Sequence, residues 1–126
     1  MNKVELSAEF SSAVRALKRS IGMLISMDAV DAAAAIIVKV IDALEALSKS
    51  DVSKSVSDLW ACSFVINRVI YNAISENLGK NSDHATAAGC LAKECKFKEA
   101  YEQYMIANSE IAKDTGFAVI FMEQKS

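Results

Sequence analysis

The histidine and cysteines of this chain are the side chains with the greatest capacity for covalent or acid–base chemistry. There is one histidine, His84, and three cysteines, Cys62, Cys90 and Cys95. An imidazole can activate a thiol as a nucleophile, and a helix would bring His84 within a few turns of Cys90 or Cys95. No carboxylate is placed to orient the imidazole, so a thiol enzyme or small-ligand bundle remains an alternative. The default expectation is free cysteines that pack as small apolar residues.

The sequence lacks the residue patterns that metal and cofactor sites require. A protein metal site takes three or four ligands at coordinating spacing, and one histidine with two cysteines does not provide them. The glutamates between 94 and 110 are spaced as a solvated face, without the Glu-x-x-His pairs of a di-iron bundle. No glycine-rich phosphate loop is present. We therefore predict no catalytic, metal-binding or cofactor-binding residues, and a protein that is not an enzyme.

The densest group of basic residues is Arg15, Lys18 and Arg19, which a helix would place beside one another. A nucleic-acid-binding domain usually has a basic surface, whereas the net charge of this chain is −2. A nucleic-acid-associated helical protein that uses these three residues is therefore the alternative function, and nucleic acid is an unlikely partner.

Aromatic side chains at helical spacing are the candidate partner-binding residues. Most such aromatics form the core, but we expect Tyr71 and Tyr101 to reach a surface groove in which an amphipathic partner helix could dock. The complete predicted set is Trp60, Phe64, Tyr71, Tyr101, Tyr104, Phe117 and Phe121.

The elements that would position these residues are helices. The chain has 126 residues, 52% of them hydrophobic, with no proline and only four glycines, which favours long helices with short connections. We predict an all-α fold, a five-helix bundle that forms one domain over 1–126. The predicted helices span 7–27, 28–48, 52–78, 83–95 and 97–114.

The second of these stretches is predicted to be a central helix. It reads DAVDAAAAIIVKVIDALEAL, and its charged residues Asp31, Lys39, Asp42 and Glu45 fall within an arc of about 120° on a helix. A helix with so narrow a polar stripe must be covered on two or three sides. It is therefore either the middle of the bundle or part of an oligomer interface.

Two flanking helices are expected to bury a single apolar face each. In 7–27, Ser7 is the expected N-cap and Arg15 and Arg19 lie opposite the apolar seam. That seam consists of Phe10, Val14, Leu17, Ile21 and Leu24.

In the helix predicted over 52–78, Ser63 and Asn67 fall near the middle of the apolar arc, and Gly79 is the expected terminator. The apolar arc consists of Val56, Leu59, Trp60, Phe64, Ile66, Ile70 and Ile74.

The last two helices carry a family resemblance. The stretch ATAAGCLAKECKFKEAYEQYMIANSEIA, within 81–114, resembles a single tetratricopeptide unit. Cys95 stands where that family has its turn glycine, and Ala100, Tyr104 and Ala107 stand where its second helix packs. The departures are the cysteine itself, His84 in place of an early large residue, and the absence of a terminal proline near Ala112. The resemblance implies a tight helical hairpin.

Location and partners follow from what the chain exposes and lacks. The N-terminus has no signal-peptide pattern and the longest apolar run, 32–38, is far shorter than a membrane span, so we expect a cytoplasmic protein without membrane contact. The uniformly apolar segment 117–122 must dock on the bundle or meet a partner. The predicted function is a non-catalytic protein–protein interaction module, an adaptor, chaperone or inhibitor, with homo-oligomers possible.

Overall fold

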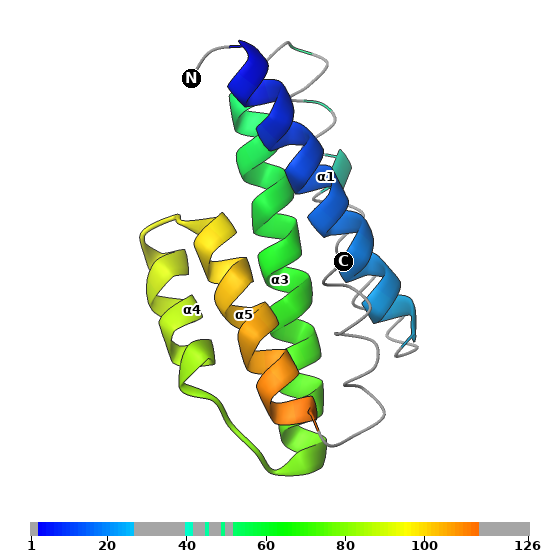
Figure 1. Ribbon diagram of the computed structural model, residues 1–126, viewed down its shortest axis with the longest axis vertical. Coiled ribbons are helices and arrows are strands. Elements are labelled where there is room, and N and C mark those ends of the chain that lie inside the picture. Colours follow the sequence, from blue (N-terminus) through cyan, green and yellow to red (C-terminus); the bar gives the residue numbers. More distant parts are fainter. Residues whose placement is uncertain (1–2, 27–39, 42–44, 46–48, 50–51, 114–126) are drawn as a thin grey trace. The chain divides into compact units, whose positions relative to one another are not determined.

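The computed structural model describes residues 3–26, 40–41, 45, 49 and 52–113, and within these residues it contains helices joined by turns and no strand. The all-α prediction is therefore confirmed. The helices, drawn in Figure 1, are α1 (Lys3–Ser26), α3 (Val52–Leu78), α4 (Asp83–Lys93) and α5 (Phe97–Ala112). Most of the expected central helix 28–48 and all of the apolar segment 117–122 lie outside the described residues, so the five-helix bundle stays a prediction.

The chain divides into two compact units, Met1–Ile66 and Asn67–Ser126. The first contains α1 and the beginning of α3, and the second contains the end of α3 together with α4 and α5. The expectation of a single domain over the whole chain stays a prediction.

Helix α1 of the first unit begins earlier than expected. It starts at Lys3, so Ser7 lies inside the helix and the prediction of an N-cap at Ser7 was wrong. The residue types before Ser7 explain the difference, because Glu5 and Leu6 are good helix formers and nothing in the segment interrupts a helix.

The buried face of α1 is also not the predicted one. Leu17 and Leu24 are buried as expected, but Phe10, Val14 and Ile21 are only partly buried. The face that is buried consists of Ala13, Ala16, Leu17, Ser20, Met23 and Leu24. At about 100° per residue this face is turned by roughly 80° from the predicted seam. Alanine and serine allow a neighbouring backbone to approach closely, which a search for large apolar residues overlooks.

Helix α3 buries the face that its sequence predicts. All seven residues of the predicted apolar arc are buried, and Ser63 and Asn67 are fully buried among them. On its outer side Lys54 pairs with Asp58 at 3.0 Å, one turn apart. The helix ends where Gly79 adopts a left-handed backbone with φ of 64°, and the Gly79 N–H donates to the Ser75 carbonyl at 2.8 Å.

The second unit has a short hairpin, α4 and α5, that packs on itself and runs beside the end of α3 (Figure 1). Ser82 caps α4, because its hydroxyl accepts a hydrogen bond from the His84 N–H. Helix α4 ends at Lys93 and α5 at Ala112, each two residues before the predicted end. The side chains that α5 buries are Ala100, Tyr101, Tyr104, Ala107, Asn108, Ile111 and Ala112.

The turn between α4 and α5 is a Schellman motif with cysteine at its left-handed position. Cys95 has φ of 59°, its N–H donates to Ala92 O at 3.0 Å, and the Lys96 N–H donates to Leu91 O at 3.0 Å. These are the two reverse hydrogen bonds of that motif, in which glycine is the usual residue. A side chain in the left-handed region costs about 1–2 kcal/mol, so this turn is held by its surroundings at some cost.

Candidate functional site

Helix α1 presents three distinct faces. The buried face is described above. Beside it runs an apolar stripe, Phe10, Val14, Ile21 and Ile25, of which the first three are partly buried and Ile25 is 64% exposed. The next face carries Lys18 and Arg15, both exposed, with Ser11 and Gly22 between them around the helix. An apolar stripe therefore borders a basic face.

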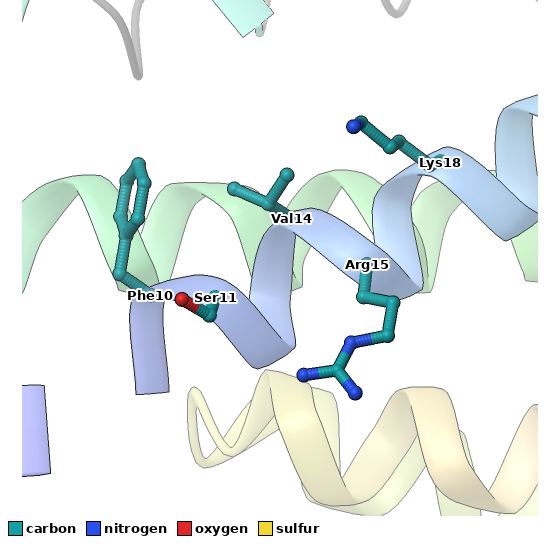
Figure 2. A pocket seen from close by; sticks show the side chains of 5 residues that line it. All are labelled: Phe10, Ser11, Val14, Arg15 and Lys18. Atoms are coloured by element: carbon teal, nitrogen blue, oxygen red, sulfur yellow. The ribbon is translucent and has the colours of Figure 1, made fainter. Parts of the chain in front are cut away.

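An open groove of about 300 Å³ follows the border between the stripe and the basic face. Among the described residues it is lined by Phe10, Ser11, Val14, Arg15 and Lys18. Figure 2 shows Phe10, Val14 and Lys18 projecting from the same side of α1, while Arg15 extends from the other edge. The groove thus combines an aromatic ring, a β-branched side chain and two cations within about two helical turns.

The cations of the groove are available to a ligand. Neither Arg15 nor Lys18 forms an ion pair within the part of the chain that the structure describes, and both side chains are exposed. The stretch from Phe10 to Met27 contains no acidic residue, although the whole chain has a net charge of −2. The groove is consequently the basic region of an acidic chain.

The predicted aromatic surface is instead part of the interior. The described members of the predicted set are buried, with exposed fractions of 5% to 8%: Trp60, Phe64, Tyr71, Tyr101 and Tyr104. The expectation that Tyr71 and Tyr101 line a surface groove therefore differs from the structure, because helix packing covers both rings. Phe117 and Phe121, the other two predicted residues, lie outside the described part of the chain.

Two of these tyrosines join the elements of the second unit. Their rings, Tyr71 on α3 and Tyr104 on α5, lie 5.7 Å apart between centroids at an angle of 47°. The Tyr71 hydroxyl accepts a hydrogen bond from the buried Ser82 N–H at 2.9 Å, at the start of α4. Burial raises the pKa of the Tyr104 phenol; the charge of Arg68 acts in the opposite direction, and Tyr71 adds to the increase. These rings hold three helices together.

A buried asparagine makes a second link between α3 and α5. Asn108 is fully buried, and its Nδ2 donates to the backbone carbonyl of Asn67 at 3.3 Å. The sequence predicts that Asn67 lies in the apolar arc of α3, but the spacing along one helix does not predict that its backbone carbonyl accepts this bond. The sequence analysis does not single out Asn108, because α5 carries several other polar residues, a second amide at Gln103 among them.

The imidazole of His84 faces oxygen atoms of α5. His84 Nδ1 lies 2.8 Å from Gln103 Oε1, and Nε2 lies 3.7 Å from Glu110 Oε2. Cys90 and Cys95 are exposed free thiols of the hairpin. Neither thiol is hydrogen-bonded to His84. The structure therefore does not bring together the thiol and imidazole that a nucleophilic pair would need.

Comparisons with protein families, with characterised proteins and with solved structures found no significant match to this chain. Within the described residues, no group of three or more histidine, cysteine or acidic side chains is placed to hold a metal ion. None of the described helices has the length and apolar character required to cross a membrane.

The sequence predicts only part of the groove on α1. The basic group Arg15, Lys18 and Arg19 supplies two of its lining residues, whereas the predicted apolar seam places Phe10 and Val14 in the core. A signal was available: Ala13, Ala16 and Ser20 recur at i, i+3 and i+7 and form a face of small residues on which helices can pack closely.

Proposed function

We propose that this protein is a small, non-catalytic helical module that binds another protein, as an adaptor, chaperone or inhibitor. The observation that carries the proposal is the groove on α1, where Phe10 and Val14 remain partly exposed beside two cations. Neighbouring apolar side chains that stay partly exposed on a folded chain are typical of protein interaction sites. Self-association through the same face belongs to this proposal.

The absence of catalysis is part of the proposal and has local support. The nitrogens of His84 face Gln103 and Glu110, so the imidazole is engaged by the hairpin itself. Exposed free thiols at Cys90 and Cys95 suit a reducing compartment, which supports a cytoplasmic location.

We also propose that α4 and α5 form a helical hairpin of the tetratricopeptide type. Two observations support this: the left-handed backbone of Cys95, at the place of that family's turn glycine, and the burial of Ala100, Tyr104 and Ala107 on α5. In this proposal the hairpin has a structural role, because Ala100, Tyr104 and Ala107, which match the family's packing positions, are buried and cannot contact a ligand.

A photo-crosslinking experiment tests the protein-binding function. A benzophenone amino acid replaces Ser11, an exposed residue at the groove, and in a matched variant it replaces Asn72, an exposed residue of α3. After irradiation in an extract of the source cells, we expect discrete protein adducts from position 11 and none from position 72. Equal labelling at both positions, or no adduct at either, would contradict the proposal.

A nucleic-acid-associated protein is the second candidate, because Arg15 and Lys18 are exposed and have no ion-pair partner among the described residues. Phosphate contacts would make binding strongly dependent on salt. Gel-shift measurements with duplex DNA and with RNA at low salt test it, and the absence of a shift would remove it.

A further inference from the structure

The groove on α1 has a composition that selects a particular kind of protein partner. The apolar stripe that borders the groove continues beyond it, from Phe10 to Ile25, over about 22 Å or roughly four helical turns. A straight stripe of that length matches the apolar face of another helix, which presents side chains at i, i+3, i+4 and i+7. A shallow stripe with isolated side chains would suit an extended strand less well, because it offers no sheet edge.

The charges beside the stripe specify the partner further. Lys18 and Arg15 both line the groove, and no acidic residue occurs in the sequence between Glu9 and Asp28. A helix that covered the stripe would place one flank over these two cations. Complementary charge on that flank would raise the association rate and disfavour basic helices.

We propose that the α1 groove binds an amphipathic helix of a partner protein whose flank carries carboxylates opposite Arg15 and Lys18. This inference rests on the proposed protein-binding function and adds the chemistry of the partner. The apolar stripe favours a helix over a nucleic acid, because phosphates leave Phe10, Val14 and Ile25 without a partner. Carboxylates on the helix match Arg15 and Lys18, which form no ion pair with any residue that the structure describes.

Three labelled peptides of about 18 residues, or five helical turns, provide the probe. All carry the same leucine face, and their flanks carry glutamate, glutamine or lysine respectively. Fluorescence anisotropy with the full chain should give the tightest binding for the glutamate peptide. We expect about a tenfold preference over the lysine peptide at low salt, decreasing as added salt screens the charges.

Two variants assign the preference to the groove. Arg15→Glu/Lys18→Glu changes two exposed side chains and should reverse the order of the glutamate and lysine peptides. The control, Lys80→Glu/Lys93→Glu, makes the same charge change at two exposed lysines of the second unit and should preserve the order. Ser11→Trp, which fills the groove from an exposed position, should weaken all three peptides.

Other results would overturn the inference in distinguishable ways. Equal affinity for the three peptides would refute the acidic flank, and no binding of any peptide while Ser11 crosslinks to a protein would refute the helical partner; in both cases the protein-binding function would stand. Tighter binding of duplex DNA or of phosphatidylserine vesicles than of the glutamate peptide would assign the groove to those ligands. Self-association abolished by Arg15→Glu/Lys18→Glu would assign it to a second copy of the chain.

Discussion

The α1 face and the hairpin unit use similar residues in opposite ways. In the second unit the aromatic rings are buried, Tyr71 bonds the start of α4, and Asn108 bonds the backbone of α3. On α1, Phe10, Val14 and Ile25 remain partly or largely exposed beside Arg15 and Lys18, two exposed cations. Neither cation forms an ion pair among the residues described. The comparison shows that the second unit buries its aromatic rings and bonds its buried amide, whereas α1 keeps part of its apolar surface exposed.

The largest test of this contrast replaces one isoleucine in each region with alanine. Ile74 is fully buried in the second unit, and Ile25 is 64% exposed on α1. Ile74→Ala should lower the free energy of unfolding by about 3 kcal/mol, because it removes buried methyl groups and leaves a cavity. Ile25→Ala should change it by no more than about 0.5 kcal/mol. Urea denaturation of both variants measures the difference, and similar losses would break the comparison.

A smaller effect is expected from the hydrogen bond between α3 and α4. Tyr71→Phe keeps the ring against Tyr104 but leaves the buried Ser82 N–H without its acceptor, which should cost about 1 kcal/mol or slightly more. Ser75→Ala removes an exposed hydroxyl bond to Lys80 O in the same junction and should cost less. If thermal denaturation ranks the two variants in the reverse order, the buried bond does not stabilise the unit.

Matched glycine substitutions at the two exposed cysteines should have opposite signs. Cys95 is in the left-handed region, so Cys95→Gly relieves the backbone and should raise stability by about 1 kcal/mol. Cys90 lies inside α4, where Cys90→Gly should lower stability by a few tenths to about 1 kcal/mol. A loss of stability in both variants, measured by chemical denaturation, would show that the turn does not constrain Cys95 in this way.

The smallest expected effect is a dependence on alkaline pH. Because burial raises the pKa of Tyr104, the unfolded chain releases its phenolic proton at lower pH than the folded chain. Stability should therefore fall as the pH rises above about 10, the ordinary tyrosine value, and the decrease should level off above the folded pKa. Tyr104→Phe should show a shallower decline across the same range. Equal slopes in the two proteins would exclude Tyr104 as the cause.

Local signals in the sequence identify much of the fold correctly. The absence of proline predicts helices, and Gly79, the expected terminator, ends α3 in a left-handed conformation. The buried face of α3 follows its large apolar residues, including the polar exceptions Ser63 and Asn67. Each of these features depends on the preferences of one residue or on spacing along one helix.

The candidate site was less predictable, because it depends on which side chains remain exposed after the helices have packed. Both the Phe10 seam and the Ala13–Ala16–Ser20 face of α1 are compatible with a helix, and the side-chain types do not say which one a neighbour will cover. The same limit applies to Tyr71 and Tyr101, whose rings suit either a core or a groove until their exposure is known.

By itself, the sequence determined the helical class and the ends of α3, because backbone preferences and helix terminators act within a few residues of the chain. Only the tertiary structure decided that the aromatic rings of α3 and α5 from Trp60 to Tyr104 are largely buried and that His84 meets Gln103 and Glu110. It also decided that Phe10 and Val14 line a groove together with Arg15 and Lys18. The physical reason is that burial and pairing are set by contacts between residues far apart in the chain, and many such contacts satisfy the same local pattern.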